Sequence, residues 1–397
     1  MVNDPPAFER VILWVPHPKL LWVRIGGMTV LERHLFTIAR AGLKQVQIAD
    51  HEPAAERLAR LRLPARLEIT WVKRDATSTA SCAAPYLSLS GDHFLRVDAL
   101  AFIARETLTS SRCYEDDSKL SVITVVMKDE DVLIRDKHPL PRRSYKRLEW
   151  PHQHAAIIDW IMASGPKKQD GFMARHFDRH LSLAASRKLL ETSVTPNQMT
   201  VFSTLLGLLG CSFFLGDDRL HYAIGSLLVL SHSILDGCDG ELARVRFQES
   251  DFGSDLDFWG DNIVHLALFS CLGIGFWRTG NGPHTLVLSA LADIGVLASA
   301  LAAWHHRRSG RQASVVAPEA GVVQETSRNL LDSRLARLGN LLAQRDFIYL
   351  LVVLSFVDMV YEFLWAAAIG GLLYFAIILH LRRVNEHEQA RQPHPAR

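Results

Sequence analysis

The chain lacks the features that mark several common protein classes. Its 397 residues include only five cysteines and no C-x-x-C pair. The spacing excludes a zinc ribbon or a disulfide framework and favours a reducing compartment. The net charge of +2 is too small for a nucleic-acid-binding protein, so we expect no nucleic-acid partner. The cysteines are Cys82, Cys113, Cys211, Cys238 and Cys271.

Charged residues are also scarce, at 22%, whereas hydrophobic residues make up 48%. The mean hydropathy is slightly positive. These values exclude a disordered chain and are unusual for a soluble enzyme. The first residues, MVNDPPAFER, have no basic segment followed by an apolar one, so we expect no cleaved export signal.

Residues 1–165 have the pattern of an α/β domain. Short apolar runs at 11–15, 46–49, 86–90 and 121–127 suit buried strands. Segments with helical periodicity lie between them, at 29–43 and 97–108. Strands that alternate with helices predict a mostly parallel, doubly wound sheet.

The C-terminal half is membrane-like. Apolar runs occupy 199–216, 220–235, 258–277 and 285–304, and a longer run at 347–381 suits two helices with a turn near Glu362. Asp358 interrupts the fifth of these six helices. Each single run is close to the roughly 20 residues that cross a bilayer. Buried core helices are the alternative for any one run, but so many runs in succession favour membrane insertion. We therefore predict an all-α domain of six transmembrane helices at 196–385.

Basic residues indicate the orientation of these helices. Lysine and arginine are frequent in 167–188, 307–345 and 382–397, whereas the loops on the opposite side hold only Arg219 and Arg278. The positive-inside rule places both termini in the cytoplasm. We predict a multi-pass protein of the cell membrane that ends in a cytoplasmic tail at 386–397.

Two connecting segments, within 170–190 and 325–344, have apolar residues at helical spacing. Amphipathic helices of this kind can lie among lipid headgroups or pack on the front domain, and the sequence leaves both interpretations open. We assign the first, with its flanks at 166–195, as a juxtamembrane amphipathic helix.

Four aspartates lie on either side of the loop between the second and third expected spans. Asp236 and Asp239 are three residues apart, and Asp257 and Asp261 are four apart. On helices, both spacings place the members of a pair on one face. Clustered carboxylates repel one another at low dielectric, and divalent cations such as Mg²⁺, Mn²⁺ or Ca²⁺ remove that repulsion.

Other residues of this stretch suit a phosphorylated ligand. Gly240 and Gly253 permit close approach of a ligand or a neighbouring helix, and Arg244 can present a planar fork to a phosphate. Metal ions, an arginine and a spare carboxylate are the components of phosphoryl transfer. His232 and His265, within the expected spans, are interpreted as packing residues.

The stretch DGCDGELAR, eight residues and GSDLDFWGD resembles the signature D-x2-D-G-x2-A-R-x8-G-x3-D-x3-D of the CDP-alcohol phosphatidyltransferases. The resemblance, over roughly 170–385, implies transfer of a substituted phosphoryl group from a CDP-alcohol to an acceptor hydroxyl with release of CMP. It also implies Mg²⁺ or Mn²⁺ as a pair of ions, and pairing of two chains through membrane helices. The implied metal ligands are Asp236, Asp239, Asp257 and Asp261. Asp261 is also the implied catalytic base, and the implied CDP contacts are Gly240, Ala243 and Arg244. TPNQMT at 195–200 resembles the start of the family's first span, where Asn197 is either a nucleotide contact or part of a plain helix start.

Residues 11–165 resemble the sugar-phosphate nucleotidyltransferases. Residues 18–49 resemble the segment after that family's glycine-rich loop, and SGDHF at 90–94 resembles its metal-binding strand end, with Asp92 as the candidate ligand. The G-x-G-x-R loop expected before Lys19 is absent, so the backbone N–H groups that hold a triphosphate are missing. A second carboxylate is not evident at LEWPHQ (148–153). We therefore expect a nucleotidyltransferase-like domain at 1–165 without activity. The order of the two domains resembles bifunctional enzymes that make CDP-inositol in one half and use it in the other.

The sequence thus predicts a membrane CDP-alcohol phosphotransferase of phospholipid or inositol-phosphodiester synthesis. Two alternatives stay open: a bifunctional enzyme that also makes the CDP-alcohol in its front domain, and a non-catalytic membrane scaffold. The four retained aspartates argue against a scaffold. Donor alcohol, acceptor and preferred metal are left undetermined.

Overall fold

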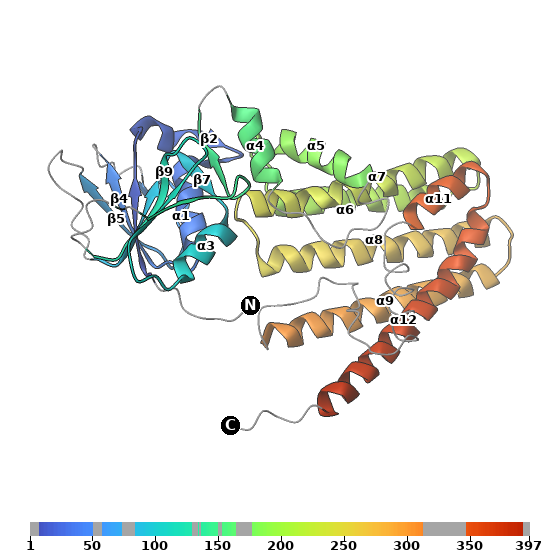
Figure 1. Ribbon diagram of the computed structural model, residues 1–397. Helices are drawn as coiled ribbons and strands as arrows, with labels where there is room; N and C mark the ends of the chain where they lie inside the picture. Colours follow the sequence, from blue (N-terminus) through green and yellow to red (C-terminus); the bar gives the residue numbers. More distant parts are fainter. Residues whose placement is uncertain are drawn as a thin grey trace. The chain divides into compact units, whose positions relative to one another are not determined.

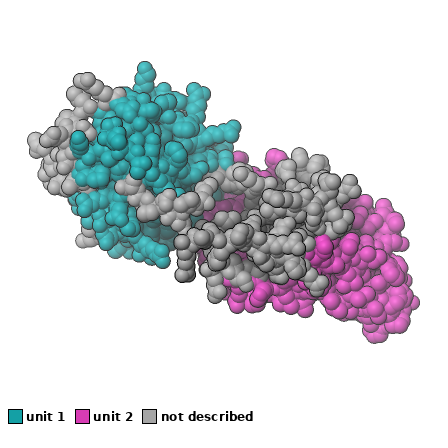
Figure 2. Space-filling model, turned by 60° about the horizontal axis from the view of Figure 1, so that its bottom comes forward, with its two compact units in different colours: residues 1–166, 190–193, 245–247 teal, residues 167–189, 194–244, 248–397 magenta. Residues whose placement is uncertain are grey.

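The computed structural model describes residues 8–50, 58–73, 84–128, 134, 136–149, 153–163, 177–312 and 347–391. The amphipathic segment expected at 325–344 lies outside these residues. Figure 1 shows a sheet-containing N-terminal part and a helical C-terminal part. The chain divides into two compact units, coloured in Figure 2. Unit 1 holds residues 1–166, 190–193 and 245–247, and unit 2 holds the rest.

Unit 1 is built on a seven-stranded sheet of order β10-β8-β9-β6-β1-β4-β5. Most neighbouring strands are parallel, and β9 is antiparallel to both of its neighbours. The seven strands are β1 (Arg10–Trp14), β4 (Gln45–Asp50), β5 (Glu68–Lys73), β6 (Tyr86–Ser90), β8 (Arg112–Glu115), β9 (Ser121–Val126) and β10 (Asp136–Pro139). The smaller strands are β2 (Arg24–Ile25), β3 (Met28–Thr29), β7 (His93–Leu95) and β11 (Tyr145–Arg147). All four strands expected from apolar runs are present, which confirms a mostly parallel α/β region.

The helices of unit 1 follow from local sequence signals. The helix α1 (Val30–Arg40) begins after Thr29, whose hydroxyl accepts from the Glu32 N–H while the Glu32 carboxylate accepts from the Thr29 N–H. This capping box satisfies two N–H groups that the helix leaves unpaired. Three further elements are η1 (Pro18–Trp22), α3 (Val97–Arg105) and α4 (His154–Met162). The segments 29–43 and 97–108 therefore contain helices, as expected.

Unit 2 consists of helices throughout its described part. They are α5 (Arg179–Leu189), α6 (Pro196–Phe213), α7 (Arg219–Val245), α8 (Asp251–Arg278), α9 (His284–Gln312), α11 (Phe347–Phe356) and α12 (Val360–Arg391). The last apolar run breaks at Asp358, the residue expected to interrupt the fifth helix, and the φ of Asp358 is +61°. The turn therefore lies four residues before Glu362, near which it was expected. Aspartate tolerates this left-handed conformation better than most residues. Glu362 instead lies in the first turn of α12, where a negative charge suits the helix dipole.

The packed centre of unit 2 is apolar and joins α6 to α12. Its fully buried members include Val264, Leu268 and Leu272 of α8 and Leu364 of α12. Among the described residues, two stretches are long and apolar enough to cross a membrane, His284–His305 of α9 and Val360–His380 of α12. The helices α7 and α8 contain the acidic signature residues at one end, and the described part of α11 has ten residues.

Candidate active site

Three of the four predicted aspartates come together in the structure. Asp236 and Asp239 lie near the C-terminal end of α7, and Asp257 lies near the start of α8. One oxygen of each carboxylate lies within 4.8 Å of the other two. Asp236 and Asp239 are buried, at 4% and 6% exposure. Repulsion among such groups is strong unless cations are present, and hard carboxylate oxygens suit Mg²⁺ or Mn²⁺.

The Asp239 carboxylate is oriented by two donors. The Thr200 hydroxyl, from the second turn of α6, donates to Oδ2, and the Gly240 N–H donates to Oδ1. Thr200 is itself buried and its hydroxyl also reaches the Pro196 carbonyl, at 3.2 Å. These contacts restrict the direction in which Asp239 can present its remaining lone pairs.

Asp261 lies one turn beyond Asp257 and has a different partner. Its Oδ1 is 3.5 Å from Nε2 of His232, a residue that is 2% exposed. Nδ1 of His232 is 2.9 Å from the Ser203 carbonyl. A carbonyl only accepts, so Nδ1 is the donor, and Nε2 is the atom directed at Asp261. The interpretation of His232 as a packing residue alone is therefore incomplete, because the ring faces the proposed base.

The two signature glycines make room for polar side chains. A Cβ built on Gly240 would lie 3.2 Å from Nη1 of Arg244, so the missing side chain allows the guanidinium to fold back over α7. A Cβ on Gly253 would lie 2.9 Å from Oδ1 of Asn197. Asn197, in the first turn of α6, therefore lies beside the signature of α8. Thr195 caps the same helix in a capping box, so the plain helix start and the placement of Asn197 beside the signature occur together.

The front domain has no comparable cluster in its described part. Asp92 accepts from the Ser90 hydroxyl and contacts Nδ1 of His93 at 2.7 Å. The other nitrogen of His93, which is 1% exposed, faces Asp116 at 3.2 Å. Burial by itself raises the pKa of Asp92, but the hydrogen bonds from His93 and Ser90 lower it to about 2.

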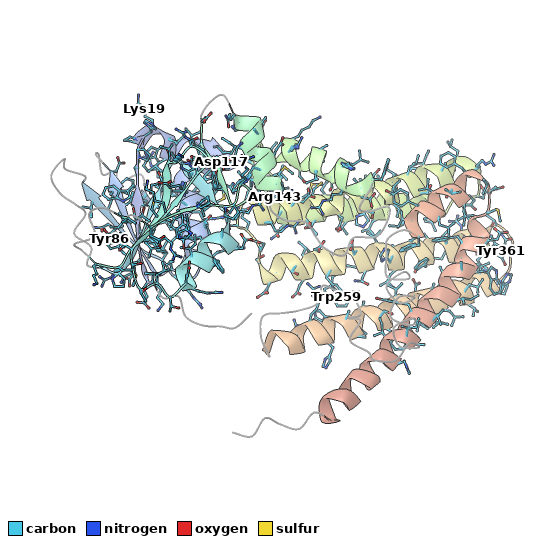
Figure 3. All side chains as sticks on the ribbon, in the orientation of Figure 1. Lys19, Tyr86, Asp117, Arg143, Trp259 and Tyr361 are labelled. Carbon is cyan, nitrogen blue, oxygen red and sulfur yellow. The ribbon has the colours of Figure 1, made fainter. Side chains whose placement is uncertain are left out.

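Asp92, the candidate metal ligand of the front domain, is therefore already paired with the buried side chain of His93. Lys19 is exposed on η1, on the outside of unit 1 (Figure 3). Between β1 and α1 the chain forms η1 and the short β2–β3 hairpin. The segment between β1 and α1, where the glycine-rich loop was expected, is thus formed by other elements.

Thr200 and His232 are the contributors to the site that sequence reasoning did not assign. Their helical spacing from residues already selected could have indicated both. His232 lies four residues before Asp236 on the same helix, and Thr200 lies three residues after Asn197, so each shares a helix face with a residue already selected. The sequence does not indicate which aspartate each one meets, because those contacts join different helices.

Comparison with known proteins supports the assignment of the helical part. Residues 193–367 match the family model described as CDP-alcohol phosphatidyltransferase. A bifunctional IPC transferase and DIPP synthase of Thermococcus kodakarensis is 36% identical over 126 residues, which cover 32% of this chain and 27% of that protein. One from Rubrobacter xylanophilus is 39% identical over 123 residues, covering 30% and 26% respectively. The chain thus aligns with about a quarter of the length of these relatives.

Among solved structures, the phosphatidylinositol phosphate synthase of Mycobacterium tuberculosis with CDP-DAG bound is similar at 17% identity, with a TM-score of 0.37. The match covers 51% of this chain and 93% of that one. The same enzyme in complex with manganese and citrate matches at 19% identity and a TM-score of 0.36, covering 50% and 88%.

Proposed function

We propose that this chain, whose residues 193–367 match the CDP-alcohol phosphatidyltransferase family model, is a membrane phosphotransferase with its active site at the facing ends of α7 and α8. The observation that carries the proposal is the gathering of Asp236, Asp239 and Asp257 within 4.8 Å, in the spacing of the family signature. The substrates are a CDP-alcohol and an acceptor hydroxyl, and CMP is the second product.

The donor set fits a divalent cation pair. Asp236, Asp239 and Asp257 would hold the ions together with Asp261, and bound Mg²⁺ or Mn²⁺ would neutralise the charge of the diphosphate. The burial of two of these carboxylates supports this role, because a buried cluster of anions is unstable without cations.

The chain's own side chains position the substrates. Arg244 would bind the diphosphate through its guanidinium, and Asn197 would contact the nucleotide from α6. Asp261 accepts the proton of the acceptor hydroxyl. The acceptor oxygen then bonds to the phosphorus that carries the alcohol, the bond to the bridging diphosphate oxygen breaks, and CMP leaves with the electron pair.

The six-span arrangement also belongs to this proposal. Most exposed large apolar side chains of the described residues lie beyond residue 200; they include Phe202, Leu205 and Leu209 of α6, Ile294 and Leu301 of α9, and Trp365 and Ile369 of α12. An apolar outer surface of this extent suits lipid contact. We infer six spans, α6 to α9, α11 and α12, with both termini and the site on the cytoplasmic side.

The front domain is proposed to have no nucleotidyltransferase activity. The contacts of His93 with Asp92 and Asp116 support this conclusion, because the candidate ligand already has a partner inside the fold. The test uses the full chain with CTP and a panel of alcohol phosphates. Pyrophosphate release that is lost in Asp92→Asn would instead favour the bifunctional alternative.

The transferase proposal is tested on membranes that contain the protein. They are supplied with CDP-diacylglycerol or CDP-inositol and a panel of polyols, and the products are identified by mass spectrometry. We expect CMP release that disappears with EDTA, returns with Mg²⁺ or Mn²⁺, and is absent in Asp236→Asn and Asp257→Asn. Lys19→Ala, on the exposed η1, should leave transfer intact. Activity in the presence of EDTA would refute the metal site, and the absence of any product would favour a scaffold.

A further inference from the structure

The end of α7 belongs to unit 1 although the rest of that helix belongs to unit 2. Residues 245–247, here called the clasped loop, group with residues 1–166 and 190–193. The clasped loop follows Arg244 directly, and five residues separate it from Gly253. It therefore lies in the chain segment that joins the two halves of the aspartate signature.

The helix α7 ends in a left-handed backbone conformation at Phe247, which is unfavourable for a residue with a side chain. The Gln248 N–H donates to the Ala243 carbonyl at 2.8 Å, and Phe247 has a φ of +50°. This is the geometry of a Schellman motif, in which glycine usually occupies the left-handed position. A residue with a Cβ is strained there, so Phe247 requires interactions that offset the strain.

Two arginines of unit 1 satisfy the carbonyls that the helix end leaves unpaired. Nη1 of Arg33, from α1, donates to the Val245 carbonyl at 2.9 Å. Nη2 of Arg62 donates to the carbonyls of Arg246 and, at 3.1 Å, Phe247. Cations at this position also suit the negative end of the helix dipole. Three consecutive carbonyls are thus held by side chains of the front domain.

The same helix α1 holds the ring of Phe247. Phe36 stacks on it, with ring centroids 5.5 Å apart and an interplanar angle of 17°. The guanidinium of Arg40 lies 5.0 Å from the ring centre and that of Arg33 lies 5.9 Å from it. Arg33, Phe36 and Arg40 recur at helical spacing on α1, so one helix face makes all of these ring contacts.

The side chain of Arg246 makes further contacts inside unit 1. We call these contacts, together with those that Arg33, Phe36, Arg40 and Arg62 make with the clasped loop, the clasp. It is 5% exposed, and its Nη2 donates to the carbonyls of Thr192, at 2.8 Å, and Leu190, at 3.2 Å. A Cβ on Gly27 would lie 2.6 Å from Nε of Arg246, and the φ of Gly27 is +80°. Only glycine meets both conditions, so the β2–β3 hairpin is shaped to receive this arginine.

We propose that the front domain positions the transferase site: Arg33, Phe36 and Arg62 are positioning residues that hold the chain segment between the two aspartate pairs. This inference rests on the proposed function. Helix ends fray when their carbonyls lack partners, and both halves of the signature connect to this segment within a few residues. Because a displacement of about 1 Å can reduce a rate by about 10²-fold, loss of the clasp is expected to reduce transfer.

The test compares the full-length protein with the variants Phe36→Ala and Arg62→Ala. Phe102→Ala and Arg105→Ala are matched controls, since both residues are exposed on α3. CMP release is measured with CDP-diacylglycerol or CDP-inositol, whichever the wild type uses, and hydrogen exchange is measured without substrate. We expect the clasp variants to lose about ten- to a hundredfold of kcat and to exchange the Gln248 amide faster, with β1 and β4 still protected. The controls should match the wild type.

Two further variants separate the clasp from folding and from the helix end. Phe36→Tyr keeps the stacked ring and should retain turnover. Phe247→Gly removes the ring but supplies the residue preferred at a left-handed helix end, so it should lose turnover in spite of an unstrained backbone. Normal turnover in Phe36→Ala, Arg62→Ala and Phe247→Gly, from an active wild type, would overturn the positioning role alone. An inactive wild type would overturn the proposed function, and unchanged Gln248 exchange would overturn the clasp itself.

Discussion

Asp261 and Arg244 have different expected roles, and substitutions at the two residues separate chemistry from binding. Asp261→Asn removes the proton acceptor but leaves three carboxylates for metal and substrate. General-base removal costs about 10²–10⁴-fold in rate, so turnover should fall by that order while metal-dependent binding of the CDP-alcohol persists. Arg244→Ala should weaken binding first, because its partner is a phosphate already present in the ground state.

The measurement combines titration of each purified variant with CDP-alcohol plus Mg²⁺ and an initial-rate assay. Near-normal turnover in Asp261→Asn would mean that Asp261 is not the base. Complete loss of metal-dependent binding in the same variant would mean that it acts mainly as a metal ligand.

His232 is a residue whose importance depends on a single contact, the 3.5 Å approach of Nε2 to Asp261. Replacement by alanine removes the buried ring that faces Asp261, so kcat should fall by on the order of tenfold while KM for the CDP-alcohol changes little. His221→Ala is the matched control, because this exposed histidine lies at the opposite end of α7. Equal kinetics in the two variants would limit His232 to helix packing.

At the scale of elements, α6 and α8 meet where Gly253 lies against Asn197. Alanine at 253 favours helix formation by roughly 0.5–1 kcal/mol, but its Cβ would approach Oδ1 of Asn197 to 2.9 Å. Gly253→Ala should therefore leave the thermal midpoint unchanged or raised and reduce turnover about tenfold or more. Gly370→Ala, in the interior of α12 where a Cβ meets nothing within 4 Å, should leave turnover unchanged and the midpoint unchanged or raised. A large fall in the midpoint of Gly253→Ala would indicate a packing role instead.

The helix α1 of unit 1 contains an ionisable side chain, His34, that makes the stability of this unit depend on pH. Burial lowers the pKa of His34 to about 4, and its Nε2 donates to the Gly91 carbonyl at 3.1 Å. The unfolded chain, with an ordinary pKa near 6.5, takes up a proton before the folded one does. Stability therefore falls as pH decreases from about 6.5 to about 4, by at most roughly 3 kcal/mol for this group.

Thermal unfolding of the full chain in detergent, followed between pH 4 and 7, measures this dependence. His34→Gln should flatten the curve in that window. The contribution of Asp92 is separate, because its pKa of about 2 preserves stability above about pH 4, and that stability is lost as pH falls toward 2. An unchanged slope in His34→Gln would contradict the assignment.

For the whole molecule, the six-span arrangement predicts which loops lie on each side of the bilayer. The loops that contain Asp218 and Asn281 should be extracellular, and Ser193, before α6, should be cytoplasmic. Single cysteines placed at these positions in a cysteine-free background are treated in intact cells with a membrane-impermeant thiol reagent. Positions 218 and 281 should react and position 193 should react only after lysis. Labelling of all three in intact cells would contradict the topology.

Local sequence determined the parts of this protein that depend on neighbours along the chain. The strands β1, β4, β6 and β9 follow from short apolar runs, and the helices α1 and α3 follow from apolar periodicity, because both patterns depend on which residues of an element are buried. The spacing of Asp236 and Asp239 likewise places both on one face of α7. Residues three or four apart on a helix have no other arrangement.

Tertiary structure decided which distant residues meet. Thr200 reaches Asp239, His232 faces Asp261, and Phe36 stacks on Phe247 across 211 positions of sequence. The pattern of residues along the chain does not predict these pairs, because they depend on how separate helices and loops pack. The break at Asp358 is different, because this aspartate already interrupts the apolar run in the sequence, and the structure added only the position of the turn. The sequence thus specified a cluster of acidic residues, and the fold supplied the groups that orient them.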